Sequence, residues 1–248
     1  MNKHNTYIFC DETKFYLNNN DSEESIYYLG IAIEKNQYLK LKDRLKEILE
    51  NRRIKAKTLH STSIFRKKRP RIELMEDLTN LIIDNNLKCF CHKYEKNELF
   101  EKAKLLGKFN SSIINFNKVE FQALFFFMTN LNTYIRDFKP NLLEKEIGMF
   151  FDRNVYGVNE TESFVFPNDN FIISDMTFCE KSEIDLLFLP DFIGFILKKT
   201  IENTNSENVG NEVNENANKN YIKLKSSGNL NFVNIKNEII EKTINKLK

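Results

Sequence analysis

Apolar positions along the chain fall into blocks whose spacing alternates between that of strands and that of helices. Short apolar runs bounded by turn residues predict strands, and apolar residues that recur every three or four positions predict amphipathic helices. The predicted strands are Thr6–Cys10, Ser25–Glu34, Leu87–Tyr94, Glu146–Phe151 and Asn170–Ser174. The predicted helices are Tyr38–Glu50, Arg71–Asn85, Ile113–Ile135 and Leu186–Ile201. This succession favours an α/β fold in which helices flank a mixed β-sheet.

The last part of the chain departs from this pattern. Residues 203–220 are rich in Asn and Glu and have little to bury, so we expect a flexible, disordered insertion there. Val233–Lys248 has an apolar stripe at helical spacing and predicts a C-terminal helix that docks on the body, on a protein partner or on a second copy. We find no internal repeat and expect a single domain over residues 1–248.

Composition narrows the protein class more than the function. The net charge of +2 neither demands nor excludes nucleic acid, so any basic surface must be local. The N-terminus does not resemble a signal peptide, no apolar stretch approaches the roughly 20 residues of a membrane span, and the four cysteines read as reduced thiols. We therefore expect a cytoplasmic protein that makes no contact with membranes.

Several apolar runs end on an aspartate. The four aspartates placed in this way are Asp11, Asp152, Asp175 and Asp191. Carboxylates held together repel one another, and a buried cluster is stable mainly when a cation neutralises it. Oxygen ligands suit Mg²⁺ or Mn²⁺, and such ions promote phosphodiester hydrolysis. The alternative is that each aspartate simply begins a turn, as aspartates often do.

Glu120 is a further candidate because it lies at the centre of the apolar stripe of the predicted helix Ile113–Ile135. A lone carboxylate is costly in such surroundings. It would either reach into the acidic site as a metal ligand, or lean out at a helix end, or pair with a Lys or Arg. The sequence leaves these interpretations open.

Four segments, in this order, carry a resemblance to a known family: Phe9–Lys14, Leu59–Phe65, Phe150–Arg153 and Leu187–Gly194. They resemble a strand that runs into Asp-Glu-Ser-Gly, a Phe/Leu-His segment before a helix, a strand ending in Asp, and a late Leu-Gln-x-Ala-Asp segment. Together they resemble the 3800-numbered family of bacterial domains of unknown function, over most of Tyr7–Lys198. The resemblance implies a ribonuclease H-like fold.

The resemblance also implies roles for individual residues. Asp11, Asp152 and Asp191 would form the acidic site, Glu12 is a second-line candidate, and His60 would contact the substrate or a residue of the site. Family members often accompany mobile or defence genes, which implies a role in antiviral defence.

The chain departs from the family pattern at Lys14, Phe188 and Pro190, where the family has Gly, Gln and Ala. These departures bear on substrate handling more than on metal binding, because the three aspartates remain.

Basic residues flank the His60 segment on both sides. Arg52–Lys57 precedes it, and the residues that follow it are Arg66, Lys67, Lys68, Arg69 and Arg71. If both groups face one side, they form a patch that binds nucleic-acid phosphates beside the acids. The alternative is that they are solvated loops. Zinc at Cys89–His92 is disfavoured because a structural zinc site needs four ligands and no second pair lies nearby.

These patterns lead to one main expectation and one rival. The first is a divalent-metal-dependent nuclease, or a related phosphoryl-transfer enzyme acting on nucleic acid. Asp11, Asp152 and Asp191 would hold Mg²⁺ or Mn²⁺, and Glu120 or Asp175 would complete the shell. The rival is a non-catalytic ribonuclease H-like module that binds nucleic acid or a protein partner. A plainer third interpretation is a dimeric scaffold whose acids only begin turns.

Overall fold

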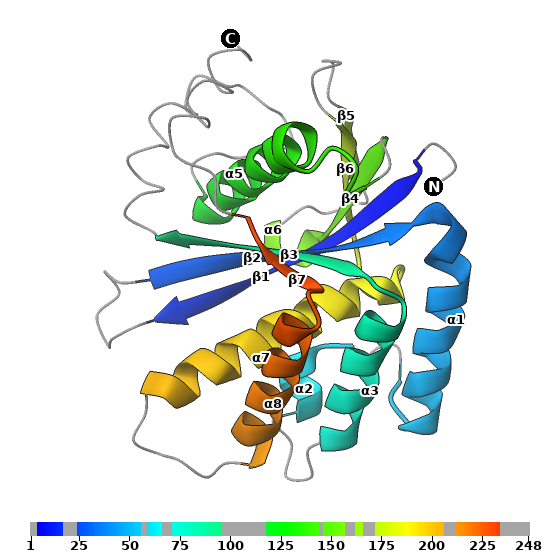
Figure 1. The fold of residues 1–248 in the computed structure, drawn as a ribbon, viewed down its shortest axis with the longest axis vertical. Coiled ribbons are helices and arrows are strands. Elements are labelled where there is room, and N and C mark those ends of the chain that lie inside the picture. Colours follow the sequence, from blue (N-terminus) through cyan, green and yellow to red (C-terminus); the bar gives the residue numbers. More distant parts are fainter. Residues whose placement is uncertain are drawn as a thin grey trace.

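A seven-stranded β-sheet forms the centre of the described part of the molecule (Figure 1). The computed structural model describes residues 4–16, 24–55, 59–65, 71–95, 118–143, 146–156, 162–165, 172–205 and 212–233. The strands are β1 (Thr6–Tyr16), β2 (Glu24–Glu34), β3 (Lys88–Glu95), β4 (Ile147–Asp152), β5 (Glu162–Val165), β6 (Ile173–Cys179) and β7 (Leu230–Phe232). Their order across the sheet is β5-β6-β4-β1-β2-β3-β7.

The sheet is mixed, as the alternation of predicted strands and helices indicated. β1, β2 and β3 form an antiparallel meander, and β4 and β6 continue the sheet parallel to β1. Cys10 of β1 pairs with Phe151 of β4, so the next residues of the two strands, Asp11 and Asp152, lie beside one another. The register of two parallel strands therefore brings together two of the predicted acids.

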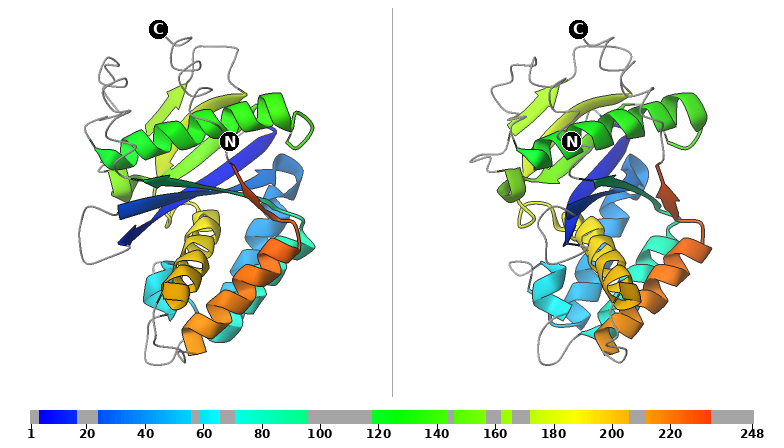
Figure 2. Two further views of the ribbon diagram at one scale, coloured as in Figure 1. Left: turned by 60° about the vertical axis from the view of Figure 1, so that its left-hand side comes forward. Right: turned by 90° about the vertical axis from the view of Figure 1, so that its left-hand side faces the viewer.

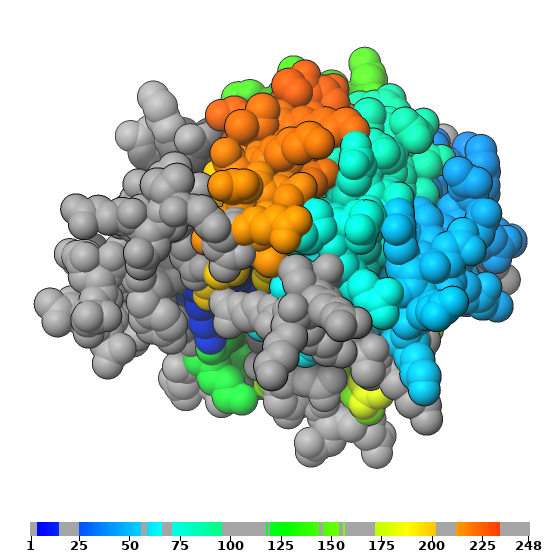
Figure 3. All heavy atoms as spheres, turned by 90° about the horizontal axis from the view of Figure 1, so that it is seen from below, coloured from blue at the N-terminus to red at the C-terminus, as the bar shows by residue number. Residues whose placement is uncertain are grey.

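Helices cover both faces of this sheet (Figure 2). One face carries α1 (Lys35–Asn51), α2 (Ser61–Phe65), α3 (Ile72–Asp84), α7 (Phe188–Asn205) and α8 (Glu212–Ser226), and the other carries α5 (Val119–Thr133). Seen from below, α8, α3 and α1 lie side by side (Figure 3). Shorter helical segments are η3 (Tyr134–Phe138), α6 (Arg153–Tyr156) and η4 (Asp185–Leu187). No helix in the described ranges combines the length and apolar character needed to cross a membrane.

Two hydrophobic cores lie on the two faces of the sheet. Side chains alternate along a strand, so Tyr7 and Phe9 of β1 pack in the core under α7, while Ile8 and Cys10 pack in the core under α5. Because both faces are covered, the central strands are apolar at consecutive positions. This is why they appear in the sequence as unbroken apolar runs.

Most predicted elements are present, with shifted ends. The helices expected at Tyr38–Glu50 and Arg71–Asn85 are α1 and α3. The strand predicted at Asn170–Ser174 was wrong in its bounds, because β6 begins at Ile173 and continues to Cys179, and residues 170–171 lie outside the described residues. The described part of the helix predicted at Ile113–Ile135 is α5, which continues as a π-helical turn to Phe138, and residues 113–117 lie outside the described residues.

The flexible insertion predicted over residues 203–220 was also wrong. The helix α7 extends to Asn205, and α8 begins at Glu212, with residues 206–211 outside the described ranges. The helix α8 has acids in its first turn and lysines in its last turn, an arrangement that the helix dipole favours. Ala217 and Leu224 on its narrow apolar face pack in the core under α7. The helix predicted at Val233–Lys248 lies outside the described residues except for Val233.

Candidate acidic site

Three elements bring the aspartates of the predicted site together. Asp11 lies within β1, Asp152 is the last residue of β4, and Asp191 lies in the first turn of α7. All three line one pocket of about 240 Å³, together with Glu12 and His60. Asp11 does not end its strand as predicted, since β1 continues to Tyr16. The convergence depends instead on the pairing of β1 with β4 and on the first turn of α7, which brings Asp191 to the same pocket.

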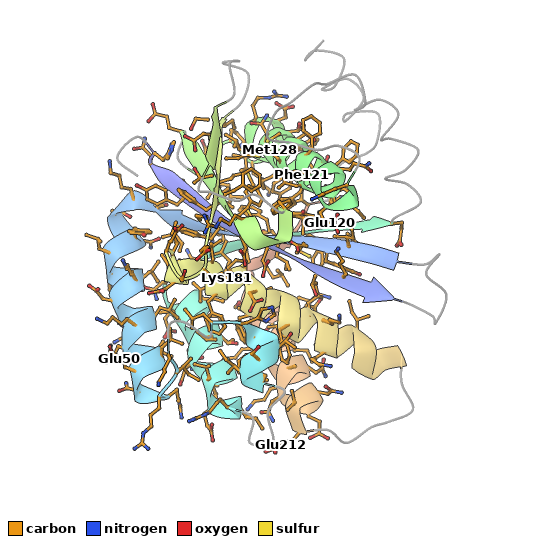
Figure 4. The ribbon with its side chains drawn as sticks, turned by 180° about the vertical axis from the view of Figure 1, so that it is seen from behind. Glu50, Glu120, Phe121, Met128, Lys181 and Glu212 are labelled. Carbon is orange, nitrogen blue, oxygen red and sulfur yellow. The ribbon has the colours of Figure 1, made fainter. Side chains whose placement is uncertain are left out.

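Lys181 inserts its ammonium group among these carboxylates. Its Nζ lies 3.1 Å from Asp11 Oδ2, 3.1 Å from Asp191 Oδ1 and 3.7 Å from Asp152 Oδ2. Only 12% of the Lys181 side chain is exposed, so solvent screens these interactions weakly. The lysine is on the turn that follows β6, on the α7 side of the sheet (Figure 4). Sequence reasoning missed it, because a lysine between Glu180 and Glu183 resembles an ordinary solvated turn.

Burial disfavours the charged forms of two of these acids. Burial, together with smaller repulsions from Asp191 and Glu12, raises the pKa of Asp11 well above its usual range, although Lys181 opposes the rise. Burial also raises the pKa of Glu12 to about 7, with Lys181 and Lys14 opposing and Asp152 adding to the rise. Further positive charge in the pocket would favour the charged forms of both acids.

The surroundings of Asp191 favour its charged form even though it is buried. Burial disfavours its charge, but Lys181, His60 and a hydrogen bond from Ser61 together lower its pKa. The Ser61 backbone N–H donates to Asp191 Oδ2 at 2.6 Å, and His60 Nδ1 lies 3.8 Å from Asp191 Oδ1. Burial lowers the pKa of Lys181, but the carboxylates of Asp11 and Asp191 raise it by more, so the net shift is upward. Lys181 is therefore protonated and Asp191 ionised at neutral pH.

The start of α2 forms a wall of the pocket. His60 is largely exposed there, with 58% of its side chain accessible, which suits a contact with a ligand from solvent. Ser61 is buried, and its Oγ has no hydrogen-bond partner among the residues that the structure describes. A buried hydroxyl without a partner is costly, so it marks a place where a missing polar group belongs.

Glu12 links the pocket to the opposite side of the sheet. Tyr156 Oη lies 3.5 Å from Glu12 Oε2 and 2.6 Å from Tyr28 Oη. Tyr28 donates in turn to the backbone carbonyl of Glu120, at 2.9 Å. The carboxyl of Glu12 is thus held at the inner end of a buried row of hydroxyl groups.

Two predicted ligands lie away from the pocket. Glu120, at the start of α5, forms an ion pair with Lys14, and it does not line the pocket (Figure 4). Burial is the largest single effect and raises its pKa, but the hydrogen bond and charge of Lys14, a backbone hydrogen bond and the charge of Lys118 together lower it by more, so the net shift is downward. Of the interpretations left open by the sequence, pairing with a lysine is the one observed. The prediction that Glu120 joins the acidic site was wrong.

Asp175 lies at the opposite end of the parallel strands. It pairs in register with Gly148 near the start of β4, whereas Asp152 ends that strand. His4 Nε2 lies 2.9 Å from Asp175 Oδ2, and Ser174 Oγ lies 3.2 Å from His4 Nδ1. The prediction of Asp175 as a metal ligand beside Asp11 was wrong, because the misplaced strand end assigned it to the wrong edge of the sheet.

The structure tests only part of the predicted basic patch. Arg66, Lys67, Lys68 and Arg69 lie outside the described residues. Arg71 is the exposed residue before α3 and does not line the pocket, and Arg52 is paired with Asp77 at 2.6 Å. A lysine that sequence reasoning did not single out does line the pocket. This is Lys198, whose Nζ donates to the backbone carbonyl of Lys14 at 2.9 Å.

The donor atoms of the pocket fit a hard divalent ion in kind, since aspartate oxygens are the ligands that Mg²⁺ and Mn²⁺ prefer. Across the described part of the chain, however, no group of three or more His, Cys, Asp or Glu side chains is already arranged to hold a metal. In the pocket, the carboxylates instead point their oxygens at the Lys181 ammonium.

Comparisons of the chain with protein-family models, with curated proteins and with solved structures find no match. The resemblance carried by the four short segments therefore stays a prediction.

Proposed function

We propose that the chain is a divalent-metal-dependent nuclease, or a related phosphoryl-transfer enzyme acting on nucleic acid. The observation that carries this proposal is the convergence of Asp11, Asp152 and Asp191, from three different elements, on one pocket that four acidic residues and two lysines line. A divalent ion is the addition that would best relieve the repulsion among buried carboxylates.

The strand arrangement supports a ribonuclease H-like form of this fold. In such a fold an antiparallel meander is continued by strands parallel to the first, and the run β3-β2-β1-β4-β6 has that order and those directions. Asp11 and Asp152 lie on neighbouring central strands, where the resemblance places its acidic residues.

Six residues of the pocket have roles in this proposal. Asp11, Asp152 and Asp191 would hold Mg²⁺ or Mn²⁺, which when bound polarises a phosphoryl oxygen and makes water more acidic. Glu12 has a pKa of about 7 and therefore can take up a proton near neutral pH. His60 and Lys198 would contact the phosphates of the nucleic acid from the pocket wall.

One observation favours the rival, a non-catalytic ribonuclease H-like module that binds nucleic acid or a protein partner. The Lys181 ammonium already contacts the aspartates, and a permanent lysine would make a metal unnecessary for folding. Such a module would bind its partner whether or not divalent ions are present. Metal binding therefore separates the two functions.

The test is calorimetric titration of Mn²⁺ into the wild type, into Asp152→Asn and into Asp175→Asn. The second variant is the matched control, because it removes an aspartate charge from the neighbouring strand but outside the pocket. We expect the wild type and Asp175→Asn to bind Mn²⁺ and Asp152→Asn to lose at least about tenfold in affinity, as removal of one charged ligand does. Binding would justify a screen for cleavage of single- and double-stranded DNA and RNA.

Folded wild type that binds no Mn²⁺ would overturn the metal-dependent reaction. Nucleic-acid binding without metal would then point to the non-catalytic module. Equal loss of affinity in both variants would mean that the ion binds elsewhere.

A further inference from the structure

We propose that Lys181 is a tethered cation that competes with the divalent ion for the same carboxylate oxygens, so that the ammonium must leave before the ion can bind. This inference rests on the proposed function and concerns how that site is controlled. It predicts that the chain limits its own affinity for metal, and that the lysine sets the metal concentration at which the site fills.

The distances make the two cations mutually exclusive. Lys181 Nζ is 3.1 Å from one oxygen of Asp11 and 3.1 Å from one oxygen of Asp191. A Mg²⁺ ion needs its oxygen ligands at about 2.0–2.1 Å, so the carboxylates would have to close around a smaller centre. An ammonium group that contacts the same two oxygens fills the space into which they would close.

The lysine is built to leave without disturbing the fold. Its backbone belongs to a turn in which the Glu183 N–H donates to the Glu180 carbonyl at 3.0 Å and the Glu180 N–H donates to Glu183 Oε2 at 3.1 Å. Glu180 is also paired with Arg153, which follows β4. The turn is therefore anchored, whereas the lysine side chain has four rotatable carbon–carbon bonds and can move the charge alone.

A second observation points to a missing ligand at this place. Ser61 also lines the pocket, its N–H is bonded to Asp191, and its Oγ is buried with no partner in the described part of the chain. The arrangement with Lys181 bound thus satisfies the carboxylates but leaves a neighbouring hydroxyl unsatisfied. An ion that arrives with water in its coordination shell would bring the donors and acceptors that Ser61 lacks.

The inference is tested by titrating Mn²⁺ into the wild type, Lys181→Met and Lys223→Met. Lys223→Met is the matched control, because the Lys223 ammonium also pairs with an acidic side chain, Glu76, but lies outside the pocket. We expect Lys181→Met to bind Mn²⁺ at least about tenfold more tightly than the wild type, since a competing charge a few ångströms away has been removed. Lys223→Met should stay close to the wild type.

Thermal unfolding provides a readout that does not depend on activity. Without metal, Lys181→Met should melt below the wild type, because the buried aspartates lose their counter-ion. Mn²⁺ should then raise its melting temperature more than that of the wild type. If Lys181→Met does not fold without metal, it is refolded with Mn²⁺ present. The titration is then repeated with Lys181→Gln, which also removes the charge.

The possible outcomes separate this inference from the proposed function. Equal or weaker Mn²⁺ binding by Lys181→Met, with binding by the wild type, overturns the competition and leaves the nuclease proposal standing. Binding by Lys181→Met alone supports the competition but overturns the metal-dependent reaction in the wild type, where the lysine then excludes the ion. No binding by either protein overturns both.

Discussion

At the scale of single residues, Glu12 is a side chain of the pocket whose pKa lies near neutral pH. Its pKa is raised from an ordinary value of 4.5 to about 7, chiefly by burial. Between these two values the folded protein holds a proton that the unfolded chain has released, so folding is favoured at the acidic end. The stability that this proton contributes is lost as pH rises through about 7.

We therefore predict that the metal-free protein is less stable at about pH 8 than at about pH 5.5, by up to about 2 kcal/mol from Glu12. Glu12→Gln should reduce that difference, because the amide does not titrate. Urea titrations at the two pH values give the free energies of unfolding, and the difference between them is compared for the wild type and Glu12→Gln. The control is Glu50→Gln on α1, whose side chain is 66% exposed. Unchanged pH dependence in Glu12→Gln would contradict the assignment.

Glu120 gives a second prediction at this scale. It is half-buried, it pairs with Lys14 and it lies outside the pocket. Ion pairs of this exposure contribute little to stability. We expect Glu120→Gln to change the free energy of unfolding by no more than about 1 kcal/mol and to leave Mn²⁺ affinity unchanged. Chemical denaturation and calorimetry measure both quantities, and a clear loss of Mn²⁺ affinity would restore Glu120 as a ligand.

The sequence predicted the three aspartates of the pocket but not the lysine among them. Each of Asp11, Asp152 and Asp191 follows an apolar run, and this local pattern is visible in one dimension. The contact between Lys181 and Asp11 joins residues 170 positions apart, and it depends on where β6 ends. The pattern that found the three aspartates also selected Asp175, because the end of a strand is the least certain feature of a sequence-based assignment.

At the scale of secondary-structure elements, α8 is a mostly polar helix whose few apolar residues belong to the core under α7. Leu224 is fully buried on its inner face, whereas Ile222, two residues earlier, is 55% exposed. Leu224→Ala should lower the free energy of unfolding by about 2–4 kcal/mol, because it removes buried methyl groups and leaves a cavity. Ile222→Ala removes similar atoms from the surface and should cost less than about 1 kcal/mol.

Both variants can be compared by urea denaturation. Equal and small effects would mean that α8 does not pack on the body. The sequence did not predict this helix, because Asn, Lys and Glu make up most of it and its apolar face is only a few residues wide. Helices of this kind are stabilised by tertiary contacts with their neighbours, here α3 and α7, which no local pattern contains.

At the scale of the whole molecule, the central sheet belongs to two cores at once. Phe127 of α5 packs in the core on one face, and Leu78 of α3 packs in the core on the other. The strands between them contribute alternate side chains to both cores, as Tyr7 and Ile8 do from β1. If the side-chain packing on one face of a central strand is lost, the strand cannot keep its position in the sheet and its packing on the other face. The two cores should therefore unfold together.

We therefore predict one cooperative unfolding transition, which both Phe127→Ala and Leu78→Ala shift. Loss of Phe127 should cost about 3–5 kcal/mol and loss of Leu78 about 2–5 kcal/mol, and each variant should lower the same single melting temperature. The chain has no tryptophan, so far-ultraviolet circular dichroism and tyrosine fluorescence are the probes, with calorimetry as a check. Two transitions, each shifted by only one of the variants, would show that the faces fold independently. The expectation of a single domain would then be wrong. The pocket draws Asp11 and Asp152 from the sheet and Asp191 from a helix on one face, so its stability would depend on that face alone.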